Sequence, residues 1–167
     1  PHESTGALVT GAVRCDDIII EGLPGNMRLL PGNEEALLAA ELKLAGRGHD
    51  GVRHLADTLA DLDGVILLDT PGTANQVFAA ALVAADWALI PINNDADSLR
   101  EARKVLNHID AIGRMGRNLR TLGLLRTVFE RGTNATEAGD HLARQLAEEH
   151  HCGVLWTSTP KDTKYRE

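Results

Sequence analysis

The segment Val65-Ile66-Leu67-Leu68-Asp69-Thr70-Pro71-Gly72 joins an unbroken apolar run to a carboxylate and a turn. Apolar runs of about four to eight residues are typical of a central parallel strand that is buried on both faces. We therefore predict a strand over residues 65–68, which would carry Asp69 to the C-terminal edge of a sheet. Open α/β sheets bind their ligands beyond that edge. A candidate site is therefore expected after Leu68.

Short apolar runs and helical periodicity alternate on both sides of this segment, which favours an α/β fold. We predict one domain over residues 1–167, with a mostly parallel sheet between two layers of helices. Asn33 and the capping box Ser98-Leu99-Arg100-Glu101 would begin two of the helices. The predicted strands lie at 27–30, 65–68, 87–90, 119–128 and 154–156, and the helices lie at 5–13, 34–45, 51–62 and 75–85, from Ser98 onward and from about Asn134 onward.

The composition excludes several classes of protein. The chain has 167 residues, 43% of them hydrophobic and only 3% aromatic, and its formal net charge of −7 argues against binding nucleic acid through its overall field. Cys15 and Cys152 match no metal or redox spacing, which suits a reducing compartment. No apolar run is long enough to cross a membrane, and no signal-peptide pattern is visible. These features lead us to expect a cytoplasmic protein.

A carboxylate at the end of an apolar strand has two interpretations. In a nucleotide-binding protein, Asp69 would hold Mg²⁺ through its water shell, and Gly72 would let a backbone N–H approach a terminal phosphate. Many parallel strands also end in Asp followed by a Pro-Gly turn, because Asp caps the next helix. The segment by itself leaves both interpretations open.

Several segments along the chain resemble, in order and spacing, motifs of the ParA/MinD family of P-loop ATPases. The family's Walker B motif D-x-P-[PG] matches 69–72, and its A-L-x-A-A-D and L-I-P-V segments match 79–86 and 88–92. Its L-L-P-[AG]-N, G-[IV]-L-L-T-M-Y-D-R and I-P-R-N segments resemble 29–33, 123–131 and 159–162. The resemblance is collinear and covers nearly the whole chain. It implies a P-loop NTPase-like fold, incomplete at the N-terminus.

The resemblance also implies a role for individual residues. Asp69 would be the Walker B carboxylate that holds Mg²⁺ through water, and Gly72 would lie in the turn that senses the γ-phosphate. Thr127 would lie near the base, and Pro160 and Lys161 would pack near adenine. The alternative for Thr127 is a satisfied hydroxyl at a strand end, and for Pro160 a simple turn proline.

For the intact protein the resemblance implies ATP and Mg²⁺ as ligands and an ATP-driven homodimer. Such dimers bind nucleoid DNA or a membrane, and a ParB-like partner stimulates hydrolysis. The stretch 125–131 is closer to the partition branch of the family than to the division-site branch. The function implied is therefore DNA or plasmid partitioning, or positioning.

The chain departs from the family in one respect, because it contains no G-K-[ST] triplet and no glycine-rich phosphate-binding loop. The family's K-G-G-x-G-K-[ST] loop cradles the phosphates with backbone amides and lysines. Because the chain starts at Pro1, we expect a fragment that begins after this Walker A region and hydrolyses ATP negligibly by itself. Two alternatives remain open: a partner-binding module that has abandoned nucleotide, and a flavodoxin-like regulatory domain. The latter predicts an acidic cluster at one strand end, where only Asp69 and, at a distance, Asp95 are available.

Two further groups of residues could bind a metal ion or a nucleic acid. His150-His151-Cys152 contains three potential metal ligands, but consecutive helical residues point in different directions, so a helix C-terminus is the favoured interpretation. A basic loop is formed by Arg114, Arg117 and Arg120, with Arg103 and Lys104 nearby in sequence. We expect a solvated loop, and non-specific DNA binding is the alternative.

Overall fold

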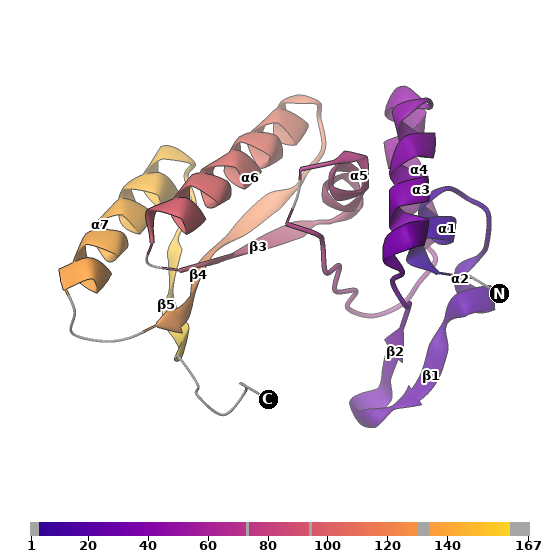
Figure 1. Ribbon diagram of the computed structural model, residues 1–167, viewed down its shortest axis with the longest axis horizontal. Coiled ribbons are helices and arrows are strands. Elements are labelled where there is room, and N and C mark those ends of the chain that lie inside the picture. Colours follow the sequence, from indigo (N-terminus) through magenta and orange to yellow (C-terminus); the bar gives the residue numbers. More distant parts are fainter. Residues whose placement is uncertain (1–3, 73, 94, 130–133, 161–167) are drawn as a thin grey trace. The chain divides into compact units, whose positions relative to one another are not determined.

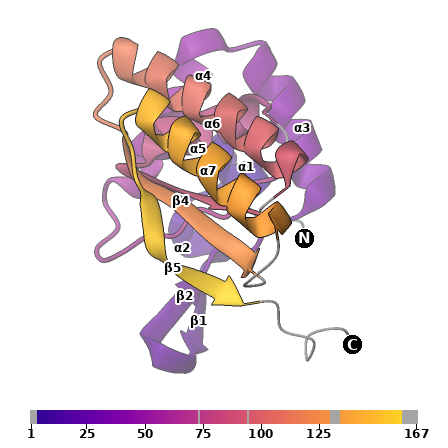
Figure 2. The ribbon, with the colours of Figure 1, turned by 90° about the vertical axis from the view of Figure 1, so that its left-hand side faces the viewer.

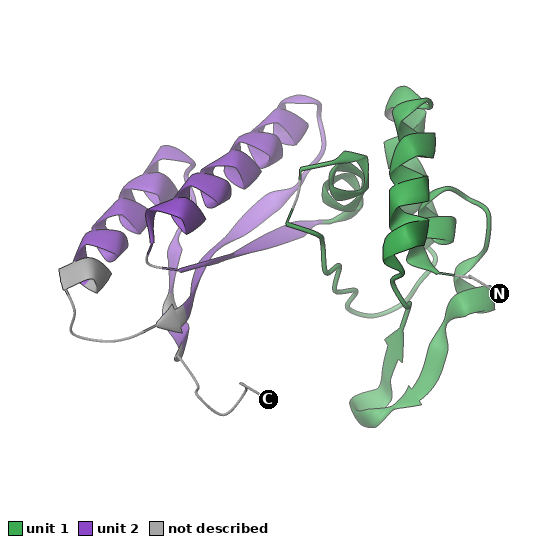
Figure 3. Ribbon diagram, viewed as in Figure 1, with its two compact units in different colours: residues 1–85 green, residues 86–167 purple. Residues whose placement is uncertain are grey.

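The computed structural model describes residues 4–72, 74–93, 95–129 and 134–160, and its contacts divide the chain into two compact units, residues 1–85 and 86–167 (Figures 1 and 3). The first unit contains α1 (Thr5–Val9), α2 (Cys15–Ile18), β1 (Ile20–Leu23), the 3₁₀ turn η1 (Pro24–Asn26), β2 (Met27–Leu29), α3 (Glu34–Ala45), α4 (Gly48–Leu59) and α5 (Gln76–Ala84). The second unit contains β3 (Trp87–Ile92), α6 (Ala96–Arg114), β4 (Arg120–Phe129), α7 (Asn134–Glu149) and β5 (Val154–Pro160).

The first unit is a cluster of helices that bury aliphatic side chains against one another. Leu44 and Ala80 are fully buried, and Leu8 and Ala40 are 1% exposed. Burial of this kind is worth roughly 1.5–3 kcal/mol for a side chain the size of leucine. The same core also contains Val9, Cys15, Ile18, Val52, Leu55, Leu59 and Val77.

Two asparagines begin helices of this unit. Asn33 Oδ1 accepts a hydrogen bond from Ala36 N over 2.9 Å and caps α3, and α3 ends at Ala45, where the sequence predicts its end. Asn75 Oδ1 caps α5 in the same way by accepting from Phe78 N over 2.9 Å. The Asn75 amide also donates to Glu41 Oε2 over 3.1 Å and so ties the start of α5 to α3.

A β-hairpin is attached to these helices. β1 and β2 pair antiparallel, with Ile20 opposite Leu29, through a turn in which Gly25 and Asn26 have φ of 72° and 56°. Glycine and asparagine tolerate this left-handed conformation. The strand predicted at 27–30 is confirmed as β2, which ends at Leu29, whereas β1 is an additional strand that was not predicted.

The predicted central strand at residues 65–68 is wrong. No strand is assigned between α4 and α5, and none of these residues forms a ladder in the described part of the chain. Val65 and Leu67 are 92% and 90% exposed. An isolated strand leaves its backbone groups unpaired and gains stability only from a neighbouring strand. The apolar run is therefore competent to form a strand but has no partner among the described residues.

The second unit carries the parallel sheet, with strand order β3-β4-β5 and both pairs parallel. α6 and α7 pack against each other and cover the same face of the sheet (Figure 2). This confirms the predicted α/β fold with a mostly parallel sheet and helices. Within the described residues of this unit, the helical layer lies on one face. Its core contains Ile90, Ile92, Leu99, Ala102, Leu106, Ile109, Leu124, Ala143, Leu146 and Ala147.

A bulge at Gly123 interrupts the register of β3 with β4. Ala88 is opposite Thr121, and the next residue, Leu89, is opposite Gly123. Gly123 has φ of 142°, and a Cβ placed on it would lie 2.7 Å from the Gly153 carbonyl oxygen. Only glycine combines this backbone conformation with such close approach of a neighbouring strand.

α6 begins earlier than predicted. Its N-cap is Asp95, whose Oδ1 accepts from Ser98 N over 2.7 Å, so the predicted capping box at Ser98 is wrong. Ser98 instead accepts from Asn93 N over 2.8 Å. Asp and Ser are comparable N-caps, and here the aspartate closer to the end of β3 caps the helix while the serine ties down the preceding loop.

Candidate functional site

The predicted site residues fall in both units. Asp69 and Gly72 lie in the segment between α4 and α5, whereas Thr127 lies in β4 and Pro160 ends β5. Phe129 of β4 is opposite Pro160, so the structure brings Thr127 and Pro160 onto one sheet edge. The strand predicted at 154–156 extends to Pro160, which is the last residue of β5. Lys161 lies outside the described residues.

Asp69 and Gly72 are both exposed in a segment without regular secondary structure. A Cβ placed on Gly72 would meet no atom within 4 Å in the described structure, so no neighbouring backbone requires glycine there. The chemical interpretation of this segment remains a prediction, because the strand that was expected to present Asp69 is not formed.

The hydroxyl of Thr127 in β4 contacts the C-terminal end of the neighbouring strand β3. Its Oγ1 lies 2.8 Å from Asn93 Oδ1 and 3.2 Å from the carbonyl oxygen of Ile92, and it donates a hydrogen bond there. A hydroxyl has one proton to donate, so these two acceptors share it. The hydroxyl is thus satisfied by hydrogen bonding within the sheet, as expected if Thr127 has only a structural role at a strand end. A role of Thr127 near a base stays a prediction.

An ion pair that no motif indicated lies beside this edge. Arg126 Nη1 is 2.9 Å from Asp140 Oδ2, and the two side chains are 13% and 25% exposed. Arg126 also donates from Nη2 to the carbonyl oxygen of Leu155 over 3.3 Å. The guanidinium therefore joins β4 to α7 and β5. The only sign of this ion pair in the sequence is that Arg126 directly follows the apolar run 122–125.

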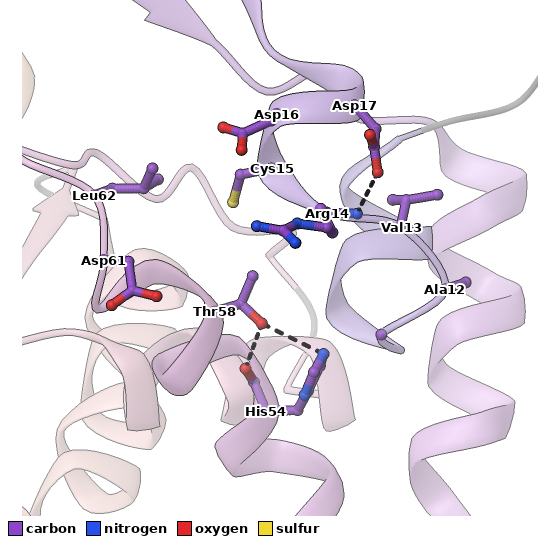
Figure 4. Close-up of a pocket in the computed structure, with 11 residues that line it drawn as sticks. Ala12, Val13, Arg14, Cys15, Asp16, Asp17, His54, Thr58, Asp61 and Leu62 are labelled. Carbon is purple, nitrogen blue, oxygen red and sulfur yellow. Dashed lines mark hydrogen bonds between the residues drawn. The ribbon is translucent and has the colours of Figure 1, made fainter.

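A cavity of about 440 Å³ opens in the first unit, and no motif pointed to it (Figure 4). One wall is the loop between α1 and α2 together with the first turn of α2, and the other is the C-terminal half of α4 with the residues just after it. The lining residues are Gly11, Ala12, Val13, Arg14, Cys15, Asp16, Asp17, His54, Thr58, Asp61 and Leu62. The sequence gives no periodic or spacing signal that relates residues 11–17 to residues 54–62.

Hydrogen bonds hold both walls of this cavity. Asp17 Oδ2 accepts from the backbone N–H of Arg14 over 2.9 Å. Thr58 donates its hydroxyl to the His54 carbonyl oxygen over 2.8 Å, and His54 Nε2 lies 3.3 Å from Thr58 Oγ1. Burial, and secondarily the charge of Asp16, raises the pKa of the Cys15 thiol, so the thiol stays protonated at neutral pH.

The segment His150-His151-Cys152 has a structural role at the end of α7. His150 Nδ1 lies 2.7 Å from Asp110 Oδ2 of α6, and the histidine side chain is only 8% exposed. Burial, and secondarily the charge of Asp110, raises the pKa of Cys152. Among the described residues, no group of three or more His, Cys, Asp and Glu side chains could hold a metal ion.

Three of the basic residues singled out in the sequence have partners in the second unit, and one of them, Lys104, pairs with Glu101 of α6 over 2.6 Å. Arg103 pairs with Glu149 of α7, which lowers the pKa of the Glu149 carboxyl mainly through their hydrogen bond. The Arg120 guanidinium lies 4.0 Å from the centre of the Trp87 ring, a cation–π distance. These three side chains thus have contacts within the second unit, and non-specific DNA binding stays a prediction.

None of the helices formed by the described residues has the length and apolar character needed to cross a bilayer.

No family model matches the chain. Among curated sequences it is 28% identical over 141 residues to the chromosome-partitioning ATPase Soj of Thermus thermophilus, an alignment that covers 83% of this chain and 53% of Soj. The chain therefore spans about half the length of that relative.

Solved structures share the fold. Cobyrinic acid a,c-diamide synthase from Mycobacterium smegmatis, with bound ATP analogue and magnesium, has a TM-score of 0.80 at 23% identity, covering 96% of this chain and 65% of the synthase. A variant of McdA from Cyanothece in complex with ATP has a TM-score of 0.87 at 19% identity, covering 99% of this chain and 65% of McdA. Identities this low show the fold alone. In its sequence motifs and in its fold, the chain resembles the ParA/MinD-type ATPases.

Proposed function

We propose that this chain is part of a ParA-like ATPase that partitions or positions DNA or plasmids through ATP-driven dimerisation. The observation that carries the proposal is the collinear set of ParA/MinD-like motifs, together with the likeness to Soj over 141 residues. In this proposal residues 1–167 form one domain of a cytoplasmic protein. Its partners are a second copy, non-specific DNA and a ParB-like activator.

In the proposed site, Asp69 binds Mg²⁺ through water, and Gly72 lies in the turn that responds to the γ-phosphate. Thr127, Pro160 and Lys161 lie near the base. The cobyrinic acid a,c-diamide synthase that shares the fold binds an ATP analogue and magnesium, which supports the choice of ligands. An exposed carboxylate followed by an uncrowded glycine fits a hydrated cation.

The 167 residues supply groups for Mg²⁺ and the base but no loop for the phosphates. Phosphoryl transfer depends on positioning and on stabilising charge, and the sequence contains no G-K-[ST] to hold the phosphates. We therefore propose that this chain by itself hydrolyses ATP at a negligible rate.

The test is the ATPase rate of the 167-residue chain, of Asp69→Ala and of Asp57→Ala, an exposed aspartate on α4 that serves as the matched control. We expect the rate of all three to equal the buffer background with Mg²⁺ present. A rate above background that Asp69→Ala abolishes and Asp57→Ala leaves intact would refute the proposed inactivity of the chain.

A second candidate is a partner-binding module that has abandoned nucleotide. One observation favours it: the segment that carries Asp69 is exposed and pairs with no other described residues. It differs from the first candidate in predicting no nucleotide binding in any longer form of the protein.

A further inference from the structure

The cavity of the first unit carries opposite charges that do not pair with each other. Arg14, the N-cap of α2, and Asp61, just after α4, both line it, and neither forms an ion pair with any described residue. Figure 4 shows the Arg14 guanidinium directed into the space between Cys15 and Thr58, with the Asp61 carboxylate on the α4 side. A hollow with separated charges of opposite sign offers a ligand two anchoring points.

The rest of the lining narrows the chemistry of that ligand. Asp16, Asp17 and Asp61 all line the cavity, so a simple anion at Arg14 would also experience repulsion. The described residues offer no cluster that could hold a metal ion. Val13 and Leu62 add apolar surface beside the charges. A cavity of about 440 Å³ lies within the size range of small-molecule sites.

We propose that this cavity binds a small zwitterion of the amino-acid type. The ligand carboxylate accepts hydrogen bonds from the Arg14 guanidinium, whose planar donors match a carboxylate. The ligand ammonium group lies against Asp61, and an apolar side chain of the ligand packs on Val13 and Leu62. Thr58 Oγ1 offers a further polar contact on the same wall.

The inference is independent of the proposed ATPase function, because no residue assigned to nucleotide or Mg²⁺ lines the cavity. The affinity should be weak. Arg14 is exposed to solvent, and exposed charge pairs contribute little in water. A dissociation constant of about 1 mM is therefore expected for a ligand that engages both charges.

The test is a titration of the ¹⁵N-labelled 167-residue chain with L-leucine, followed by the backbone amide shifts. We expect saturable shifts at residues 11–17 and 54–62. Acetate and ethylammonium, which carry one charge each, should bind at least about tenfold more weakly.

Matched variants on neighbouring positions separate the cavity from general charge effects. Arg14→Gln and Asp61→Asn should each weaken leucine binding about fivefold. Arg53→Gln and Asp57→Asn, at exposed positions of α4 outside the cavity lining, should leave it unchanged. If Arg14→Gln does not fold, as judged by circular dichroism, the pair Asp61→Asn and Asp57→Asn decides.

Several results would overturn the inference. These are the absence of saturable shifts, shifts confined to other residues, equal loss of affinity in the cavity variants and their controls, and acetate binding as tightly as leucine. The last result would reduce the cavity to an anion site at Arg14.

Discussion

Two apolar runs of the chain, residues 65–68 and β3, have similar sequences and different structures. Val65-Ile66-Leu67-Leu68 ends in Asp69, and Trp87–Ile92 leads to Asn93. Only β3 forms a strand, in register with β4, and its Ile90 and Ile92 are buried. Residues 65–68 pair with no other described residues, and Val65 and Leu67 are almost fully exposed. The difference teaches that an apolar run makes a strand only where a neighbouring backbone completes its hydrogen bonds.

The largest contrast should appear in amide hydrogen exchange. Leu124 N donates to the Gly153 carbonyl oxygen over 2.8 Å inside the sheet, whereas no backbone hydrogen bond involves residues 65–68 in the described part of the chain. We expect the Leu124 amide to exchange about a thousandfold more slowly than those of residues 65–68. Equal protection of both regions would show that residues 65–68 are paired and would remove the contrast.

Truncating one side chain in residues 65–68 and one in β4, the strand that pairs with β3, should give the next largest difference. Leu124 is fully buried in β4, and Leu67 is 90% exposed. Leu124→Ala should lower the free energy of unfolding by about 3 kcal/mol because it leaves a cavity. Leu67→Ala should change it by less than about 0.5 kcal/mol. Urea denaturation followed by circular dichroism measures both, and a comparable loss in the two variants would contradict the assigned burial.

Glycine substitutions test the backbone next to each region, at Gly123 opposite Leu89 of β3 and at Gly72 after residues 65–68. Gly123→Ala should destabilise by about 2 kcal/mol, because its φ of 142° is strained for alanine and its Cβ would lie 2.7 Å from the Gly153 carbonyl oxygen. Gly72→Ala, at a position with no atom within 4 Å of the added Cβ, is the control and should be neutral within about 0.5 kcal/mol. Thermal melts of both proteins compare them. Tolerance of Gly123→Ala would mean that the bulge is not formed.

The smallest effect concerns the edge between β3 and β4. Thr127→Val removes the hydroxyl that bonds the end of β3 and should cost about 1 kcal/mol of the free energy of unfolding. Thr121→Val, in the same strand, is the matched control and should cost less than about 0.5 kcal/mol. The comparison is made by urea denaturation. Equal effects of the two substitutions would show that the Thr127 contact contributes nothing of its own.

Local signals predicted much of this fold. Asn33 and Gly46 delimit α3, and the apolar runs at 87–90 and 119–128 correspond to β3 and β4. The N-cap of α6 was misplaced because Asp95 and Ser98 are both suitable caps, and only the loop from Asn93 selects between them. The strand at 65–68 failed for a different reason, since its formation depends on a partner that local sequence does not specify.

One of the two candidate sites could be predicted from the sequence, and the other could not. Asp69 and Gly72 could be singled out because they stand in a recognisable motif, although their geometry differs from the expected strand end. The cavity could not be predicted, because Arg14 and Asp61 carry no motif and are brought to one hollow only by the packing of helices. Long-range packing of this kind leaves no periodic trace in either segment.

The measurement that tests the proposed function most directly is calorimetry of ATP with Mg²⁺, on the 167-residue chain and on a form that includes any coding sequence upstream of Pro1. A ParA-like ATPase whose phosphate-binding loop lies outside these residues predicts no binding by the shorter chain and binding by the longer one. Binding by neither form would contradict the proposed function and favour the partner-binding module. Binding of equal strength by both would show that these 167 residues hold the phosphates without a G-K-[ST] loop.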